Sequence, residues 1–150
     1  CMGKKIKNSH LIKKGFYSKA YDLFENVGGE YSINRIIDIF PRLNTKEYYC
    51  YLMYAIYRNE TPDKHMTLCE ILMFMDLFID DSYSIIHWHV KRTVKLFPEY
   101  IKIKIWAIEL FGECPTSPFN NKELIDFAKS ILDFDYNNQI AIKIIKKYSK

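Results

Sequence analysis

The chain has 150 residues, of which 49% are hydrophobic and 16% are aromatic, so it is long enough and apolar enough to bury an ordered core. This composition excludes a disordered chain, and only five glycines and five prolines favour a few long elements over many short strands. No apolar run approaches the ~18 residues of a membrane-spanning helix, so no membrane span is expected.

The net charge of +4 is distributed unevenly. Residues 1–20 carry six lysines and no acidic residue, and residues 143–150 carry four more lysines. That leaves 12 basic against 18 acidic residues in 21–142, a net charge of about −6. An acidic central segment argues against a uniform nucleic-acid-binding surface, and no nucleic-acid partner is expected. Lysine-rich ends are usually solvated, and contact with phosphate or lipid is the alternative.

The cysteine pattern favours a reducing, cytoplasmic location. None of Cys1, Cys50, Cys69 and Cys114 forms a CxxC pair, and a disulfide framework is not expected in a chain this rich in core residues. Cys50 and Cys69 lie in apolar runs, where a thiol is expected to pack as a small hydrophobe. Met2 resembles a native start, and a lipidated Cys1 is the alternative.

The predicted elements are all helices, about eight of them in antiparallel pairs. A basic segment at 1–10 is expected to be a flexible lead-in to a single domain over 1–150, and the polar segment 59–65 is a possible hinge. Apolar residues at helical spacing then place the helices near 11–27, 31–40, 46–59, 68–79, 82–97, 101–111, 122–134 and 139–148.

Capping residues support these boundaries. Gly28-Gly29 is expected to end the first helix, and the expected N-caps are Ser32, Thr45, Thr67 and either Asn120 or Asn121. Thr67 would form a capping box with Glu70. Residues 101–106 alternate as a strand would, but 107–111 continue at helical spacing and Pro98-Glu99 suits the first turn of a helix, so a helix is predicted.

The helical turns repeat along the chain. Three segments align, IIDIFPRLNTKEYYCYLMYAI, TVKLFPEYIKIKIWAIELF and SILDFDYNNQIAIKII, with Pro41, Pro98 and Tyr136 in equivalent positions. In each segment an apolar helix ends in an aromatic-containing turn and another apolar helix follows. The stretch from Ser82 to Phe111 shows this most clearly, and it indicates that the chain is organised as helical hairpins.

The last repeat resembles the end of a tetratricopeptide (TPR) repeat. The residues that match are Ala128 in its second helix, the turn DFDYNN, Pro98 as a terminal proline, and Phe111 and Tyr54 where the first helix favours an aromatic residue. The spacing of 38 residues between Pro98 and Tyr136 exceeds the usual ~34, so a generic stack of helical hairpins is the alternative. The resemblance implies an all-α, TPR-like repeat stack whose exposed surface binds peptides or protein domains.

In its size, degenerate repeat and lysine-rich ending, the chain also resembles immunity proteins of bacterial polymorphic and contact-dependent growth inhibition toxin systems. That resemblance implies a cytoplasmic protein, not an enzyme, that neutralises a toxin domain by stoichiometric binding. A basic, nuclease-like toxin would suit an acidic blocker. The alternatives are a TPR-like adaptor or chaperone that binds peptides, and a viral helical protein that sequesters a host factor.

Chemical motifs are weak in this sequence. The imidazoles of His87 and His89 diverge on a helix, so no metal site is expected, and at least one of them is expected to pack beside Trp88. No Gly-rich phosphate loop or nucleophile pattern is present, and no cofactor is expected. A helical-repeat DNA glycosylase would need a basic concave face, and the net negative charge of residues 21–142 argues against one.

Eight residues are predicted to contact the partner. Asp76, Asp80 and Asp81 form the densest acidic group, for which the alternative is a solvated face. Tyrosines lie on several sides of the 46–59 helix, so some of them face water or a partner, and Tyr48, Tyr49 and Tyr57 are the candidate anchors. Glu109 and Glu113 complete the set.

Charge reversal at Asp76, Asp80 and Asp81 is expected to weaken capture of a basic partner, because these carboxylates would attract it electrostatically. The loss should shrink at high salt, where such attraction is screened. Partner capture by the triple variant and the wild type at low and high salt checks this, and unchanged binding would exclude the patch.

Overall fold

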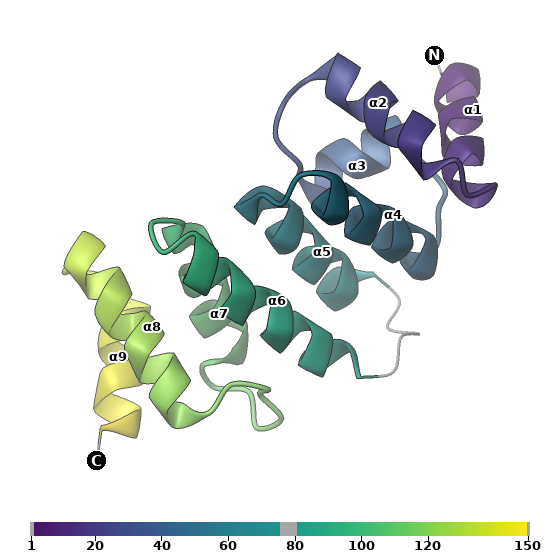
Figure 1. Ribbon diagram of the computed structural model, residues 1–150. Helices are drawn as coiled ribbons and strands as arrows, with labels where there is room; N and C mark the ends of the chain where they lie inside the picture. The colour runs from purple at the N-terminus through teal and green to yellow at the C-terminus, as the bar shows by residue number, and fades with distance from the viewer. Residues whose placement is uncertain (1, 76–80, 150) are drawn as a thin grey trace. The chain divides into compact units, whose positions relative to one another are not determined.

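The computed structural model describes residues 2–75 and 81–149, and within them it contains nine helices and no strand (Figure 1). The all-α prediction is therefore confirmed, and residues 101–106, which alternate like a strand, are helical. No helix in the described part of the chain is long and apolar enough to cross a membrane.

The chain divides into two compact units, Cys1–Ser82 and Tyr83–Lys150. Residues 59–65, considered above as a hinge, lie inside the first unit, where 59–61 connect two paired helices and 62–65 begin the second of them. Each unit has a core of its own, as a folding unit requires.

The first unit consists of five helices. These are α1 (Met2–Lys13), α2 (Tyr17–Val27), α3 (Ile33–Ile39), α4 (Thr45–Arg58) and α5 (Pro62–Phe74). Helices α4 and α5 form the main hairpin, α2 packs on α4, and α3 packs on α5. The core is aromatic: Phe24 stacks on Tyr31 with ring centroids 4.0 Å apart, and Phe40 meets Tyr51 edge-on at 5.1 Å.

The second unit consists of four helices. These are α6 (Ser82–Leu96), α7 (Ile101–Phe111), α8 (Asn121–Phe134) and α9 (Gln139–Tyr148). Helix α8 packs on both α7 and α9, which is the neighbour-to-neighbour packing of a helical-repeat stack. A chain of aromatic contacts joins the elements, because the Phe119 ring lies 5.6 Å from those of both Phe111 and Phe127.

The N-terminal region differs from its prediction. Residues 2–13 form α1 rather than a flexible lead-in, and the helix expected at 11–27 is divided in two. Gly15 makes the break, with a φ of 78° that is unfavourable for other residues. The sequence signal that divides these helices is one glycine without an accompanying proline, which is why a continuous helix was predicted.

Helix α1 is attached to the body of the first unit. The hydroxyl of Ser9 donates a hydrogen bond to the carbonyl oxygen of Pro41 at 2.6 Å, and Lys5 pairs with Asp38 on α3. The N-terminal lysines therefore belong to the same folded unit as the acidic residues of α2 and α3. Residues 1–82 carry 11 basic and 11 acidic residues, so this unit has no net charge.

Local capping explains where several helices begin. Ser32 caps α3 as predicted, accepting a hydrogen bond from the Arg35 backbone N–H at 3.1 Å. Asn44, and not Thr45, caps α4, and its side chain and that of Glu47 each accept a backbone hydrogen bond from the other residue. A capping box provides acceptors for two backbone N–H groups at once, so Asn44 is a better N-cap here than the neighbouring Thr45.

Three other expectations are corrected. Thr67 lies inside α5, which begins at Pro62 because proline suits the first turn of a helix. Helix α7 begins at Ile101, in agreement with its predicted range 101–111, but Pro98 and Glu99 lie in the preceding turn and not in its first turn. Cys50 is exposed rather than packed, whereas Cys69 is buried and its burial raises the pKa of the thiol.

Lys64 places an ammonium group in the core of the first unit. Its side chain is almost fully buried, and Nζ donates to the carbonyl oxygens of Asn59 at 2.6 Å and Ala55 at 3.4 Å, at the C-terminal end of α4. Nζ also lies 5.1 Å from the ring centroids of both Tyr21 and Tyr31. A cation is favoured at a helix C-terminus and over aromatic rings, and both contacts offset the desolvation that lowers its pKa.

Replacement of this ammonium should destabilise the first unit. Lys64→Met keeps most of the volume but removes the ammonium donor from the carbonyl oxygens of Asn59 and Ala55, of which the Ala55 oxygen keeps the Asn59 backbone N–H. The free energy of unfolding should therefore fall by about 1–2 kcal/mol. Urea unfolding measures the change. The exposed Lys19→Met is the control and should change it by less than about 0.5 kcal/mol. An equal or higher stability of Lys64→Met would show that the desolvation of the buried ammonium outweighs the stabilisation from its contacts.

Candidate functional site

The strongest candidate binding surface lies across α2 and α4 in the first unit. It consists of Tyr17, Tyr54, Tyr57 and Arg58 together with Tyr21, a mostly buried ring that Arg58 contacts, and is called the Tyr–Arg surface below. Tyr57 is its most exposed member, with 83% of the residue accessible. The Tyr17 and Tyr54 rings stack with centroids 5.8 Å apart, and Tyr57 lies 6.3 Å from Tyr54.

Helical spacing assembles this surface from two separate segments. Tyr54, Tyr57 and Arg58 share one side of α4 because they are three and four residues apart. Tyr17 and Tyr21 are one turn apart on α2, which packs against α4. The packing of α2 on α4 therefore brings the five side chains together.

Arg58 holds the cluster in place. Its Nη1 donates to the Tyr54 hydroxyl at 2.9 Å and to the Ser18 hydroxyl at 3.3 Å, and its guanidinium carbon lies 4.7 Å from the Tyr21 ring centroid. Nη2 lies 3.9 Å from a carboxylate oxygen of Asp22. The hydrogen bond from Arg58 holds the pKa of Tyr54 below its ordinary value. These contacts restrain the Tyr21 and Tyr54 rings.

The surface continues along α2 beyond Asp22. A shallow hollow of about 470 Å³ is lined there by Lys19, Asp22, Leu23, Asn26 and Val27. Val27 is exposed, and so is Phe16 at the start of the helix, beneath the ammonium of Lys19. Exposed apolar residues beside a tyrosine cluster are typical of a protein-binding surface.

Of the three predicted tyrosine anchors, only Tyr57 belongs to this surface. Tyr48 is a core residue, 1% exposed, and its hydroxyl donates to the carbonyl oxygen of Phe40 at 2.6 Å. It is therefore not available to a partner, because it shares the buried face of α4 with Tyr51. Tyr49 is half-buried, and burial raises the pKa of its hydroxyl.

Sequence reasoning missed Arg58, Tyr17 and Tyr21 as members of a site. Tyr17 and Tyr21 stand one helical turn apart, which was the only local signal. The contact between α2 and α4 is not visible in the sequence pattern, so nothing indicated that Arg58 would meet them.

Of the predicted acidic residues, the structure describes Asp81 in the first unit and Glu109 and Glu113 in the second. Asp76 and Asp80 lie outside the described residues, and Asp81 is exposed with a φ of 59°. Glu109 and Glu113 do lie together, in the second unit, where both line a groove between α7 and α9.

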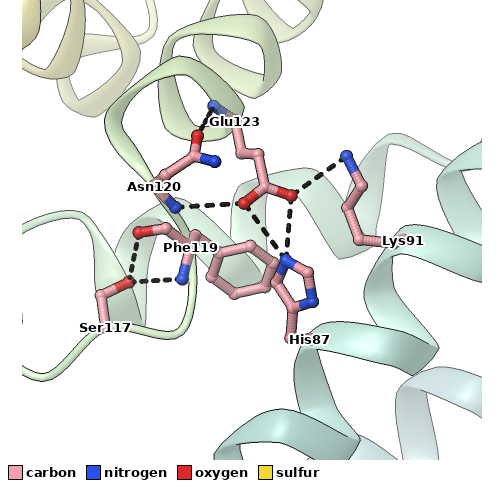
Figure 2. A network of polar contacts seen from close by, with 6 residues as sticks. All are labelled: His87, Lys91, Ser117, Phe119, Asn120 and Glu123. Carbon is pink, nitrogen blue, oxygen red and sulfur yellow. Dashed lines mark hydrogen bonds and ion pairs between the residues drawn. The ribbon is translucent and has the colours of Figure 1, made fainter.

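The most prominent polar network joins α6 to the beginning of α8. Figure 2 shows His87 and Lys91 of α6 directed at the carboxylate of Glu123. His87 Nε2 lies 2.9 Å from Glu123 Oε2, and Lys91 Nζ lies 3.1 Å from the same oxygen. The other oxygen accepts the Asn120 backbone N–H at 3.1 Å, which completes a capping box.

Every member of this network has a structural role. Partial burial acts to raise the pKa of Glu123, but the hydrogen bonds from Asn120, Lys91 and His87 outweigh it and lower that pKa. The His87 ring packs on Phe119 at 5.2 Å, whereas His89 is buried against Trp88 at 4.9 Å, as predicted for one of the two histidines. Within the described residues, no three His, Cys, Asp or Glu side chains are placed to hold a metal ion.

No family model, curated protein or solved structure matches this chain. The case for function therefore depends on the surfaces described above.

The Glu123 network makes the stability of the second unit depend on pH. A carboxyl group with a lowered pKa in the folded state stabilises it above the unfolded pKa of ~4.3, and this contribution is lost as the pH falls through the folded pKa. Glu123→Gln should therefore be about 1–2 kcal/mol less stable than wild type at pH 7, with a smaller difference at pH 3. Urea unfolding at both pH values measures this.

The matched control is Asp126→Asn, which removes an exposed carboxylate from the same helix. It should change the free energy of unfolding by less than about 0.5 kcal/mol at pH 7. If Glu123→Gln lowers the free energy of unfolding as much at pH 3 as at pH 7, then the charge of the Glu123 carboxylate is not what stabilises the network.

Proposed function

We propose that this chain is a protein-binding protein that captures one partner domain stoichiometrically through the Tyr–Arg surface. The observation that carries the proposal is the exposed Tyr57 ring, which lies 6.3 Å from the Tyr54 ring, whose hydroxyl accepts a hydrogen bond from Arg58. Tyrosine and arginine are enriched among the few interface residues that supply most of the binding energy.

Preorganisation supports this assignment. Free tyrosine and arginine side chains lose rotamer freedom when they are immobilised in a complex, and that loss opposes binding. Ring stacking and hydrogen bonds already restrict Tyr54 and Arg58 in the free protein. When a partner binds them, these side chains lose less conformational entropy than free ones would. The smaller loss favours a long-lived complex.

Binding is also favoured over catalysis by what the polar groups already do. The His87–Glu123 pair resembles an acid–base pair, as does His65–Glu60 at the same distance of 2.9 Å. The Glu123 carboxylate also accepts hydrogen bonds from Lys91 and Asn120, which ties two helices together. These bonds support a structural role for the pair.

The biological form proposed for this activity is an immunity protein that neutralises a toxin domain in the cytoplasm. The helical-repeat packing within each unit and the small size support it, since capture needs a rigid surface and no reaction centre. The first unit has no net charge, so contact through aromatic anchors, rather than long-range attraction, is its proposed source of affinity.

Truncation of the exposed anchor should weaken the complex. Tyr57→Ala removes a ring that is 83% exposed and lies outside the core, so the fold should be retained while partner affinity falls about 30-fold, or ~2 kcal/mol. The partner would be captured from the native host with immobilised protein, purified, and titrated calorimetrically against wild type and variant.

Tyr136→Ala is the matched control, because Tyr136 is 79% exposed in a turn of the second unit. Its affinity should stay within about threefold of wild type. Equal losses in both variants, or none in Tyr57→Ala, would exclude the Tyr–Arg surface. The immunity role is tested separately: expression of the captured partner alone should arrest growth, and co-expression of this chain should restore it.

A further inference from the structure

A second candidate docking surface lies entirely within the second unit. A groove of about 360 Å³ runs between α7 and α9, and its size falls in the ~300–1,000 Å³ range of ligand pockets. Its lining combines aliphatic side chains and Cys114, called the floor below, with three charged side chains, called the rim. The lining residues are Ile108, Glu109, Leu110, Glu113, Cys114, Ile140, Lys143 and Ile144.

The two walls of this α7–α9 groove are held together at three points. The Tyr148 hydroxyl donates to the carbonyl oxygen of Gly112 at 2.6 Å. A Cβ at Gly112 would lie 2.5 Å from Ile144 Cδ1, so the glycine allows the end of α7 to approach α9 closely. Lys143 pairs with Glu113 at 2.8 Å. The groove is thus a fixed feature of the unit.

Among the residues that line the groove, carboxylates outnumber ammonium groups, and Lys147 lies outside the lining but near enough to Glu113 to lower its pKa. Residues 83–150 as a whole carry 11 basic and 7 acidic residues, yet the rim has two carboxylates against one ammonium group. Lys143 neutralises Glu113 and lowers the pKa of its carboxyl group. Glu109, exposed and one turn away, forms no ion pair within the described part of the chain, so its carboxylate is open to an incoming cation.

We propose that the α7–α9 groove binds a basic amphipathic helix of a protein partner. Its aliphatic side chains would cover Leu110 and Ile140, the accessible part of the floor, and a lysine or arginine would pair with Glu109. An amphipathic helix laid in a hydrophobic groove is a recurring mode of peptide recognition. This inference rests on the proposed protein-binding function and gives the partner a chemical character.

The test uses a peptide of leucine and lysine at helical spacing, titrated into the isotope-labelled full-length protein. A peptide in which glutamate replaces lysine has the same apolar face and the opposite charge. The leucine–lysine peptide should shift the backbone amide signals of Leu110 and Ile140 and bind at least about tenfold more tightly than the glutamate peptide. Three variants then test the groove.

Glu109→Lys should weaken binding of the leucine–lysine peptide about fivefold, with a smaller loss at high salt. Ile140→Gln should weaken it about tenfold through the lost apolar contact. Glu99→Lys, the control, reverses an exposed charge in the turn before α7, outside the groove lining, and should stay within about twofold of wild type.

Equal affinity for the two peptides, signal changes confined to other residues, or a loss in Glu99→Lys as large as that in Glu109→Lys would overturn the proposal. A concentration-dependent dimer that Glu109→Lys abolishes would assign the groove to a second copy of the chain instead. Tyr57→Ala should bind the peptide as wild type does. A negative result with the peptides would therefore not count against the Tyr–Arg surface. An unchanged partner affinity of Tyr57→Ala would likewise not count against the groove.

Discussion

The contact of the Tyr21 ring with two cations joins the core of the first unit to its surface. Lys64, buried at the end of α4, lies 5.1 Å from the ring centroid, and Arg58 lies 4.7 Å from it at the exposed edge. Because the buried cation is desolvated, its attraction to the ring is stronger than that of an exposed one. The position of α2 against α4, and with it the Tyr–Arg surface, therefore depends on how the interior accommodates Lys64.

Local chemistry made much of the fold predictable. Periodic apolar residues identified the helices, and Ser32, Gly28 and Asn120 marked their ends because capping acts over three or four residues. The misplaced starts have a common cause. Thr45 and Thr67 are acceptable caps in isolation, but Asn44 and the proline at position 62 lie nearby and compete more effectively.

The binding surfaces were less predictable, since they arise from contacts between distant segments. The sequence identified Tyr57, Glu109 and Glu113 as candidates but treated Tyr48 as their equal, because helical spacing alone does not reveal which side of α4 is buried. Charge was misleading for a similar reason. When the N-terminal lysines were counted as a flexible extension, the rest of the chain had a net negative charge. Helix α1 is instead folded into a first unit without net charge.

The two surfaces lie in different compact units, and this sets what each contributes to affinity. A partner that contacts both gains from effective concentration, since the second contact forms within an existing complex. A partner that contacts one surface gains nothing from the other. Effects of Tyr57→Ala and Glu109→Lys on one partner that add in free energy would indicate two independent contacts with it. Effects confined to different partners would indicate two separate binding functions in one chain.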